Sequence, residues 1–326
     1  MNRIVKTFLE MPEYCGNLKL RLPLWIAEGS PGKSVFLCAA QHGRELHGTA
    51  ALSEVFSELP EIPLTGTVVM MPLMNPLGVR MRMQDFPSEE SRISNRKHYG
   101  PECNMNRLWT PGGMPGSVQS ALTSLIYERH VKNADAVLDI HGWNGGSSAW
   151  SNEACLETLL KLGLRMVSIA ESDSGGMLVQ RAREDGKAAF TVEIEQQNRI
   201  VPSGHRLACR IVRNFLKAYG VIPGSPELPR EQFVRRASGD LFLEAPVTGL
   251  AVPLFEAQEV VPAGAEYLRI LSVETGEVLW KYVTEEEYLS VYSGTFQTGP
   301  GSEATSIVEK GMPIAHLTRA ERIINN

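Results

Sequence analysis

The stretch Val35-Phe-Leu-Cys-Ala-Ala-Gln-His-Gly-Arg-Glu-Leu-His47 decides the fold class of this chain. It begins with an apolar run over 35–40 that is too short for a helix and is typical of a buried strand. The polar residues that follow lead into apolar positions at helical spacing, which indicates a turn between a strand and a helix. His42 and Glu45 lie in this turn, at the carboxyl end of the strand, where open α/β sheets bind their ligands.

Three more apolar runs have the length and the flanking turn residues of buried strands. They cover residues 67–73, 136–140 and 188–194. Apolar residues also recur at helical spacing, and the helices they predict lie near residues 46–59, 118–126 and 205–219. The alternation of strands and helices predicts an α/β domain whose mixed, mainly parallel sheet is flanked by helices.

The chain changes character after residue 222. The segment Pro223-Gly-Ser-Pro-Glu-Leu-Pro229 cannot form a regular element and is interpreted as a linker. Beyond it, β-branched, aromatic and glycine residues are frequent and helical periodicity is weak, which predicts a β domain. We therefore predict an α/β domain over residues 1–222, a linker over 223–229 and a C-terminal β domain over 230–326.

A weak internal repeat lies in this β-rich region. Residues 261–270 and 308–317 share the pattern V-x-x-G-x-x-apolar-x-x-apolar, which predicts a tight glycine turn before a strand in each segment. Two matching half-units favour a small pseudo-symmetric β-sandwich. The alternative is a pair of hairpins that resemble each other by chance.

The composition argues against several classes of protein. The 326 residues include 32 Lys and Arg against 37 Asp and Glu, a net charge of −5, so neither a nucleic acid nor an anionic membrane is an expected partner. Hydrophobic residues make up 43% of the chain but never form a run of about 18, which predicts a globular protein without a transmembrane helix. The five cysteines form no CxxC pair and the first residues lack a signal-peptide pattern, so a reducing, cytoplasmic location is expected.

The chain also carries residues suited to a catalytic metal site. His42 and Glu45 can direct both side chains at one point, and His141 lies at the carboxyl end of another predicted strand. Two histidines, a glutamate and a water are the usual ligands of an open catalytic zinc site. The alternative for the first pair is a surface histidine beside a glutamate that complements the helix dipole. Asp139 shares a strand face with His141 and either orients it or is held by backbone amides.

Groups for proton transfer and substrate binding lie on the neighbouring segments. Glu193 and Glu195 point to one face of an otherwise apolar strand, and the deeper Glu193 is the candidate general base. The adjacent Asn106 and Arg107 can hold a carboxylate through an amide and a guanidinium group. Taken singly, four other arginines are best explained as solvated surface charges: Arg80, Arg82, Arg92 and Arg96.

In this order, the motifs resemble those of the succinylglutamate desuccinylase/aspartoacylase family, which is related to the zinc carboxypeptidases. The matching motifs are HGxE at 42–45, NPxG at 75–78, N-x-N-R-x-W-x-P-G at 104–112, DxHG at 139–142 and TVE at 191–193. The resemblance covers about residues 30–220. The β-rich region resembles the family's C-terminal domain, a biotinyl/lipoyl-like hybrid sandwich, so the implied fold is carboxypeptidase-like with such a sandwich attached.

The resemblance implies one zinc ion per chain with three protein ligands: His42, Glu45 and His141. It implies that Glu193 is the general base and acid, and that Asn106 and Arg107 bind the carboxylate of the substrate. These assignments describe a metal-dependent hydrolase with a small anionic substrate.

Two positions depart from the family pattern. The family has an upstream arginine that polarises the scissile carbonyl, and the usual position falls near Gln84 in this chain. We favour Arg82 for this role, with Arg80 as the next candidate. Asn104 stands where the family has an aspartate, which removes a charge that could orient Arg107. The stretch that begins Asp85-Phe-Pro-Ser is expected to shape the rim of the substrate pocket.

The implied activity is hydrolysis of the amide bond of a small N-acylated amino acid or a related amide. A zinc carboxypeptidase that acts on peptides is the alternative enzyme, but the resemblance implies a C-terminal domain that narrows access to the cleft. A lipoyl-like carrier is the alternative outside enzymes. The lysine that a carrier would need, Lys281, has an apolar strand-like setting instead of a hairpin tip. A homo-oligomer is left open, since symmetric assemblies are common among soluble enzymes.

Overall fold

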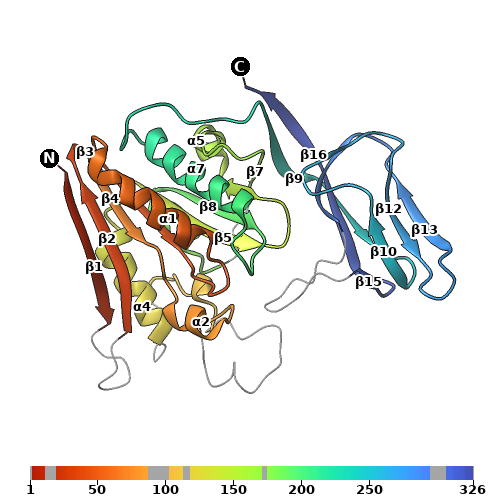
Figure 1. The fold of residues 1–326 in the computed structure, drawn as a ribbon, viewed down its shortest axis with the longest axis horizontal. Helices are drawn as coiled ribbons and strands as arrows, with labels where there is room; N and C mark the ends of the chain where they lie inside the picture. The colour runs from red at the N-terminus through yellow and green to blue at the C-terminus, as the bar shows by residue number, and fades with distance from the viewer. Residues whose placement is uncertain are drawn as a thin grey trace.

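The computed structural model describes residues 2–11, 20–86, 103–112, 118–170, 175–293 and 306–325. In these residues twelve strands form one sheet in the order β1-β2-β4-β3-β5-β8-β6-β7-β9-β16-β14-β11, and four form another in the order β13-β12-β10-β15 (Figure 1). The strands are β1 Arg3–Met11, β2 Leu20–Glu28, β3 Ser30–Ala39, β4 Thr65–Met71, β5 Ala136–Trp143, β6 Ser148–Ser151, β7 Met166–Ile169, β8 Ala188–Glu195, β9 Glu231–Glu244, β10 Gly249–Pro253, β11 Val260–Val261, β12 Glu266–Leu271, β13 Val278–Val283, β14 Tyr288–Ser293, β15 Ile307–Val308 and β16 Pro313–Ile324. The α-helices are α1 His47–Glu58, α2 Pro76–Met81, α4 Val118–Ile126, α5 Leu156–Lys161, α6 Leu178–Glu184 and α7 Pro202–Ala218.

The predicted strands form the centre of the large sheet. β4, β3, β5 and β8 are consecutive parallel neighbours, and they correspond to the four apolar runs of the sequence. The sheet becomes antiparallel on both sides of this group, where β2 pairs with β4 and β6 pairs with β8. The predicted mixed α/β class is therefore confirmed. β1 and β2 were not predicted, because their apolar stretches are short and are interrupted by charged residues or by Pro23.

Helices cover both faces of the parallel strands. The three predicted helices are present as α1, α4 and α7. On one face, α1, α5 and α7 pack against side chains such as Leu138 and Ile140 of β5. On the other face, α4 and α6 pack against the alternate residues, such as Val137. Because side chains alternate along a strand, Asp139 and His141 point to the α4 and α6 side.

The C-terminal region is rich in strands, as predicted. Residues 223–229 belong to no helix or strand. β9 then pairs with β7 of the preceding region and, over residues 231–235 and 240–244, with β16, so these two strands extend the large sheet. The four-stranded sheet is antiparallel, and one apolar cluster joins Leu268 and Ile270 from it to Ala315 and Leu317 of β16.

The two repeated segments have matching local structure. Each consists of a two-residue strand, a turn and a longer strand: β11 to β12 in the first and β15 to β16 in the second. Gly264 and Gly311 occupy equivalent turn positions with φ of 78° and 86°, a left-handed conformation that favours glycine. β11 and β16 belong to the large sheet while β12 and β15 belong to the small one, so each segment crosses between the sheets.

In the described part of the chain, no helix is both long enough and apolar enough to cross a membrane.

Candidate metal centre

The turn between β3 and α1 carries two of the predicted ligands. Its backbone is fixed by close contact with α2: a Cβ on Gly43 would lie 2.2 Å from the carbonyl carbon of Gly78, so only glycine fits there. The Gly43 N–H also donates to the carbonyl of Gln84. Asn75 caps the start of α2 by accepting from the Gly78 N–H, and its amide donates to the carbonyl of Gln41. The HGxE and NPxG motifs thus pack on each other and set the position of His42 and Glu45.

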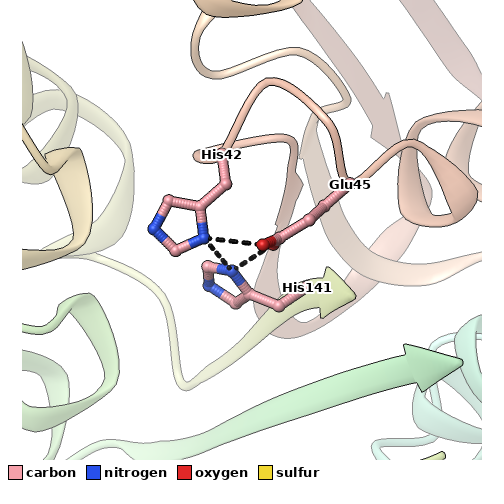
Figure 2. A group of neighbouring side chains, drawn as sticks. All are labelled: His42, Glu45 and His141. Atoms are coloured by element: carbon pink, nitrogen blue, oxygen red, sulfur yellow. Dashed lines mark hydrogen bonds and ion pairs between the residues drawn. The ribbon is translucent and has the colours of Figure 1, made fainter. Parts of the chain in front are cut away.

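The three predicted ligands come together at the carboxyl ends of β3 and β5 (Figure 2). Glu45 Oε1 lies 2.9 Å from His42 Nδ1, and Glu45 Oε2 lies 2.8 Å from His141 Nδ1. The two Nδ1 atoms are 3.3 Å apart. Glu45 and His141 are buried and His42 is mostly buried. Residues 42 and 141 are far apart in the sequence, and the parallel pairing of β3 with β5 makes them neighbours.

This geometry fits a tetrahedral ion. With metal–ligand distances of ~2.0 Å, a tetrahedral centre separates its ligand atoms by about 3.3 Å. The distance between the two Nδ1 atoms has this value, and the carboxylate contacts are a few tenths of an ångström shorter. Two imidazole nitrogens and a carboxylate are donors that suit zinc.

The charges in the cluster favour a cation at the same point. Burial opposes the charge of both imidazoles, but Glu45 raises the pKa of His42, and Asp139 together with Glu45 raises the pKa of His141 well above the usual range. Burial would also raise the pKa of Glu45, yet the two histidines outweigh it and the pKa falls below the ordinary carboxyl value. The carboxylates therefore attract protons onto the imidazoles, and a bound metal ion would replace those protons.

A chain of buried groups holds His141 from behind. His141 Nε2 lies 2.9 Å from Asp139 Oδ2, which also accepts a hydrogen bond of 2.7 Å from the Gln41 amide. The indole N–H of Trp109 donates to Gln41 Oε1 at 2.8 Å. Asp139 is completely buried, and its Oδ1 atom accepts a hydrogen bond from the Cys38 thiol. Such contacts fix the ring orientation of a metal-binding histidine.

Two glutamines hold the carboxylate of Glu45. The amides of Gln84 and Gln197 each donate to Glu45 Oε1 at 2.8 Å, and Gln197 also donates to Gln84. The sequence interpretation assigned no role to Gln41, Trp109 or Gln197. Gln197 follows the carboxyl end of β8, and that position was the available signal.

Glu193 faces His141 across two paired strands. The two residues are direct partners in the parallel ladder of β5 and β8, so their side chains project from the same face. Glu193 Oε2 is buried, and none of the described residues provides it with a hydrogen-bond partner. Burial and the charge of Glu45 raise the pKa of Glu193 to about 8. A carboxyl group with such a pKa can both accept and return a proton near neutral pH.

Of the Asn-Arg pair, Asn106 lies beside the cluster, and Arg107 donates to the Asn106 carbonyl. Asn106 Nδ2 is 3.3 Å from His141 Nε2, and Asn106 Oδ1 accepts from the backbone of Leu178. Arg107 is half-buried, and burial lowers its pKa. Asn104 Oδ1 lies 3.2 Å from His42 Nε2 and accepts from the backbone N–H of Asn106. Asn104 thus contacts a predicted ligand and shapes the turn that presents Asn106.

The structure does not bring Arg80 or Arg82 to the cluster. Both side chains are exposed near the end of α2, and neither hydrogen-bonds to His42, Glu45 or His141. Gln84, near which the resemblance places an arginine, donates to Glu45 instead. Arg92, Arg96 and the predicted pocket-rim stretch after Phe86 lie outside the described residues.

Comparison with known proteins gives a consistent result. The succinylglutamate desuccinylase/aspartoacylase catalytic domain matches residues 31–219. The N-alpha-acetyl-L-2,4-diaminobutyric acid deacetylase of Halomonas elongata is 22% identical over 246 residues, which cover 70% of this chain and 68% of the relative. A succinylglutamate desuccinylase/aspartoacylase structure from Rhodobacter sphaeroides matches with a TM-score of 0.75 at 19% identity, covering 98% of this chain and 96% of that one. The product-bound ectoine utilization protein EutE (DoeB) from Ruegeria pomeroyi matches with a TM-score of 0.72 at 20% identity, covering 97% and 95%.

Proposed function

This chain belongs to the succinylglutamate desuccinylase/aspartoacylase family, and from that premise we propose that it is a zinc-dependent deacylase. Its substrate would be a small N-acylated amino acid or a related amide. One observation carries the proposal: His42, Glu45 and His141 each offer a ligand atom within 4.8 Å of the others, and Glu193 faces His141 from the neighbouring strand. The names of a family of desuccinylases and of a related deacetylase support hydrolysis of an acyl amide.

In this proposal the zinc ligands are His42 Nδ1, His141 Nδ1 and the carboxylate of Glu45. A bound zinc ion would supply Lewis-acid chemistry, which acidifies water and polarises a carbonyl group. Asp139 would keep His141 in place, and the two glutamines would keep Glu45 in place. The ligand side chains would then have to move little when the ion binds. Zinc is the expected ion because the donors are nitrogen and oxygen atoms in a tight, buried set.

Glu193 would carry the proton of the reaction. Its carboxylate takes a proton from the attacking water while the oxygen of that water bonds to the acyl carbon. The bond between the acyl carbon and the nitrogen then breaks, and Glu193 delivers the proton to the departing amine. Glu193 is suited to both steps, because its Oε2 atom is buried without a partner among the described residues and its pKa is raised.

Asn106 and Arg107 would bind the carboxylate of the substrate. Asn106 already contacts the ring of His141, so an anion held by this pair would place the scissile amide next to the metal centre. Arg82 would polarise the carbonyl of the substrate, and Arg80 is the alternative for this role. Both are exposed, so either would have to turn towards the substrate when it binds.

The C-terminal region would form the biotinyl/lipoyl-like hybrid sandwich, with the domain limits 1–222, 223–229 and 230–326 of the sequence interpretation. The crossing of the two repeated segments between the sheets supports this architecture. The region is not proposed as a carrier. Lys281 lies within β13, where it pairs with Arg269 of β12, and not at a hairpin tip.

The decisive experiment combines metal analysis with a substrate screen on the purified full-length chain. We expect about one tightly held zinc ion per His42/Glu45/His141 centre and hydrolysis of one subset of N-acetyl, N-succinyl and N-formyl amino acids. A matched set of C-terminal peptides tests the carboxypeptidase alternative and should be cleaved far more slowly. Faster cleavage of the peptides, or deacylation that persists in a His42→Ala, His141→Ala double variant, would contradict the proposal.

A further inference from the structure

A second group of metal-binding side chains lies on two helices away from the strand ends. α1 and α7 pack side by side, as Figure 1 shows. Glu54 on α1 contacts His205 on α7, with 2.8 Å between Glu54 Oε2 and His205 Nε2. Cys209 Sγ lies 3.8 Å from the same nitrogen. The three donor atoms all fall within 4.8 Å of one another.

We propose that Glu54, His205 and Cys209 form a second metal site that binds a divalent ion of the zinc class. The inference goes beyond the proposed deacylase function and does not depend on it. A thiolate, an imidazole and a carboxylate provide sulfur, nitrogen and oxygen donors, a mixture that zinc accepts and that magnesium and calcium do not. His205 and Cys209 are four residues apart on α7, so successive turns place them on the same face.

The neighbouring arginine orients the carboxylate of this group. Arg213 donates to Glu54 Oε1 at 3.2 Å, which leaves Oε2 facing His205. Arg213 is at the same time paired with both oxygens of Glu58, so its charge is already balanced without Glu54. Arg213 therefore holds one oxygen of the ligand and leaves the other for the ion, as the glutamines do for Glu45.

Burial and access fit a metal-binding site on the surface of the fold. Cys209 is only 2% exposed, whereas the side chains of His205 and Glu54 are 28% and 48% exposed. An ion can thus enter from solvent, displace the thiol proton and keep a water in its fourth position. It would join α1 to α7. The ring of His47, at the start of α1, already accepts from the Val201 N–H before α7, so the ion would add a second tie between the helices.

The test uses cobalt(II) as the probe, because cobalt bound to a thiolate gives a charge-transfer band that nitrogen and oxygen ligands do not give. The proposed zinc centre has no thiolate, so the band reports the second site alone. Metal-free full-length protein is titrated with cobalt(II). We expect the band in the wild-type protein and in a His141→Asn variant, and its loss in Cys209→Ser. Cys155→Ser is the matched control and should keep the band, since Cys155 lies outside the cluster.

The results with the wild-type protein and its variants either support or overturn the second metal site. A wild-type protein that binds cobalt without the band overturns the proposal, as does a band that survives in Cys209→Ser or disappears in Cys155→Ser. Thermal melts of the metal-free variants show whether Cys209→Ser folds. If it does not fold, His205→Gln serves in its place, and loss of the band together with a native melting temperature supports the site. Deacylation by Cys209→Ser should equal that of the wild type, which separates this proposal from the proposed function.

Discussion

The His42/Glu45/His141 centre and the Glu54/His205/Cys209 group each combine histidine and glutamate side chains, and the second adds a cysteine. The two groups are carried by different kinds of secondary structure. In the first, His42 and Glu45 lie in the turn after β3 and His141 lies at the carboxyl end of β5, and they meet because parallel strands end at one edge of the sheet. The second lies on the faces of α1 and α7, where helical spacing alone aligns two of its members. Strand ends gather side chains from distant parts of the sequence into a buried site, while helix faces gather them near solvent.

The two groups differ most in what surrounds them. Beside the first, Glu193 has a buried carboxylate oxygen without a partner among the described residues. Beside the second, the carboxylate of Glu58 is paired with Arg213. In the proposed assignment, Glu193 would serve as the base for an ion at the first site, whereas the guanidinium of Arg213 already engages Glu58 beside the second. If both proposals hold, a buried acid beside the ion, and not the set of ligands, distinguishes a centre suited to catalysis from one suited only to binding.

The largest effect is expected from removing that acid. Glu193→Gln should lower kcat for deacylation by about 10²- to 10⁴-fold, because the amide cannot accept a proton. The zinc content should stay unchanged, since Glu193 is not a ligand. Glu195→Gln is the control: Glu195 lies on the same strand face, is partly exposed and accepts from the Ser203 hydroxyl. Near-native turnover by Glu193→Gln would remove the distinction between the two groups.

The next effect concerns the residue behind His141. Asp139→Asn should weaken zinc binding by about 10- to 100-fold, because the ring of His141 loses a buried anionic partner. Competition with a chelator of known affinity measures the change. Asp135→Asn, just before the start of β5, serves as the control, since Asp135 is exposed and accepts from the Ser34 backbone. Equal affinities in the two variants would show that His141 needs no support.

The parts of the molecule that follow from local patterns could be predicted from the sequence. The central strands are apolar because both of their faces are covered, so they appear in the sequence as apolar runs. The proposed ligands could be predicted because they lie at the ends of those runs. His42, Glu45 and His141 were brought together as predicted. The exposed positions of Arg80 and Arg82 agree with the interpretation of each arginine as a solvated surface charge, whereas the role in the site came from the family resemblance alone.

Contacts that depend on tertiary packing could not be predicted from the sequence. Gln197 meets Glu45 only because β8 ends near the turn after β3. Its place after a predicted strand is visible in the sequence, but its contact with Glu45 is not. The same holds for Glu54, which joins His205 across the packing of α1 on α7. The spacing of His205 and Cys209 is visible in the sequence, but a pair of donors without a third predicts no site.

A smaller effect is expected from Gln197→Ala. This change removes one of two donors to Glu45 Oε1 and leaves Gln84 in place, so the affinity for zinc should fall by about tenfold, the lower limit for such partners. Chelator competition again gives the affinity. Asn198→Ala, an exposed neighbour in the same turn, should bind zinc like the wild type. A loss as large as that in Asp139→Asn would mean that the carboxylate ligand needs its partners as much as the histidine does.

The smallest effect is expected at the helix group. Arg213→Gln should lower the free energy of unfolding by about 0.5–1 kcal/mol, because its ion pairs with Glu54 and Glu58 are partly exposed and screened by solvent. Deacylation should not change, since neither the sheet edge nor Glu193 is touched. Arg206→Gln, an exposed change on the same helix, is the control for altered surface charge, and urea unfolding monitored by circular dichroism measures both. A lower kcat in Arg213→Gln but not in Arg206→Gln would mean that the helix group and the His42/Glu45/His141 centre are coupled through α1. The helix group would then not be a purely binding site separate from the catalytic centre.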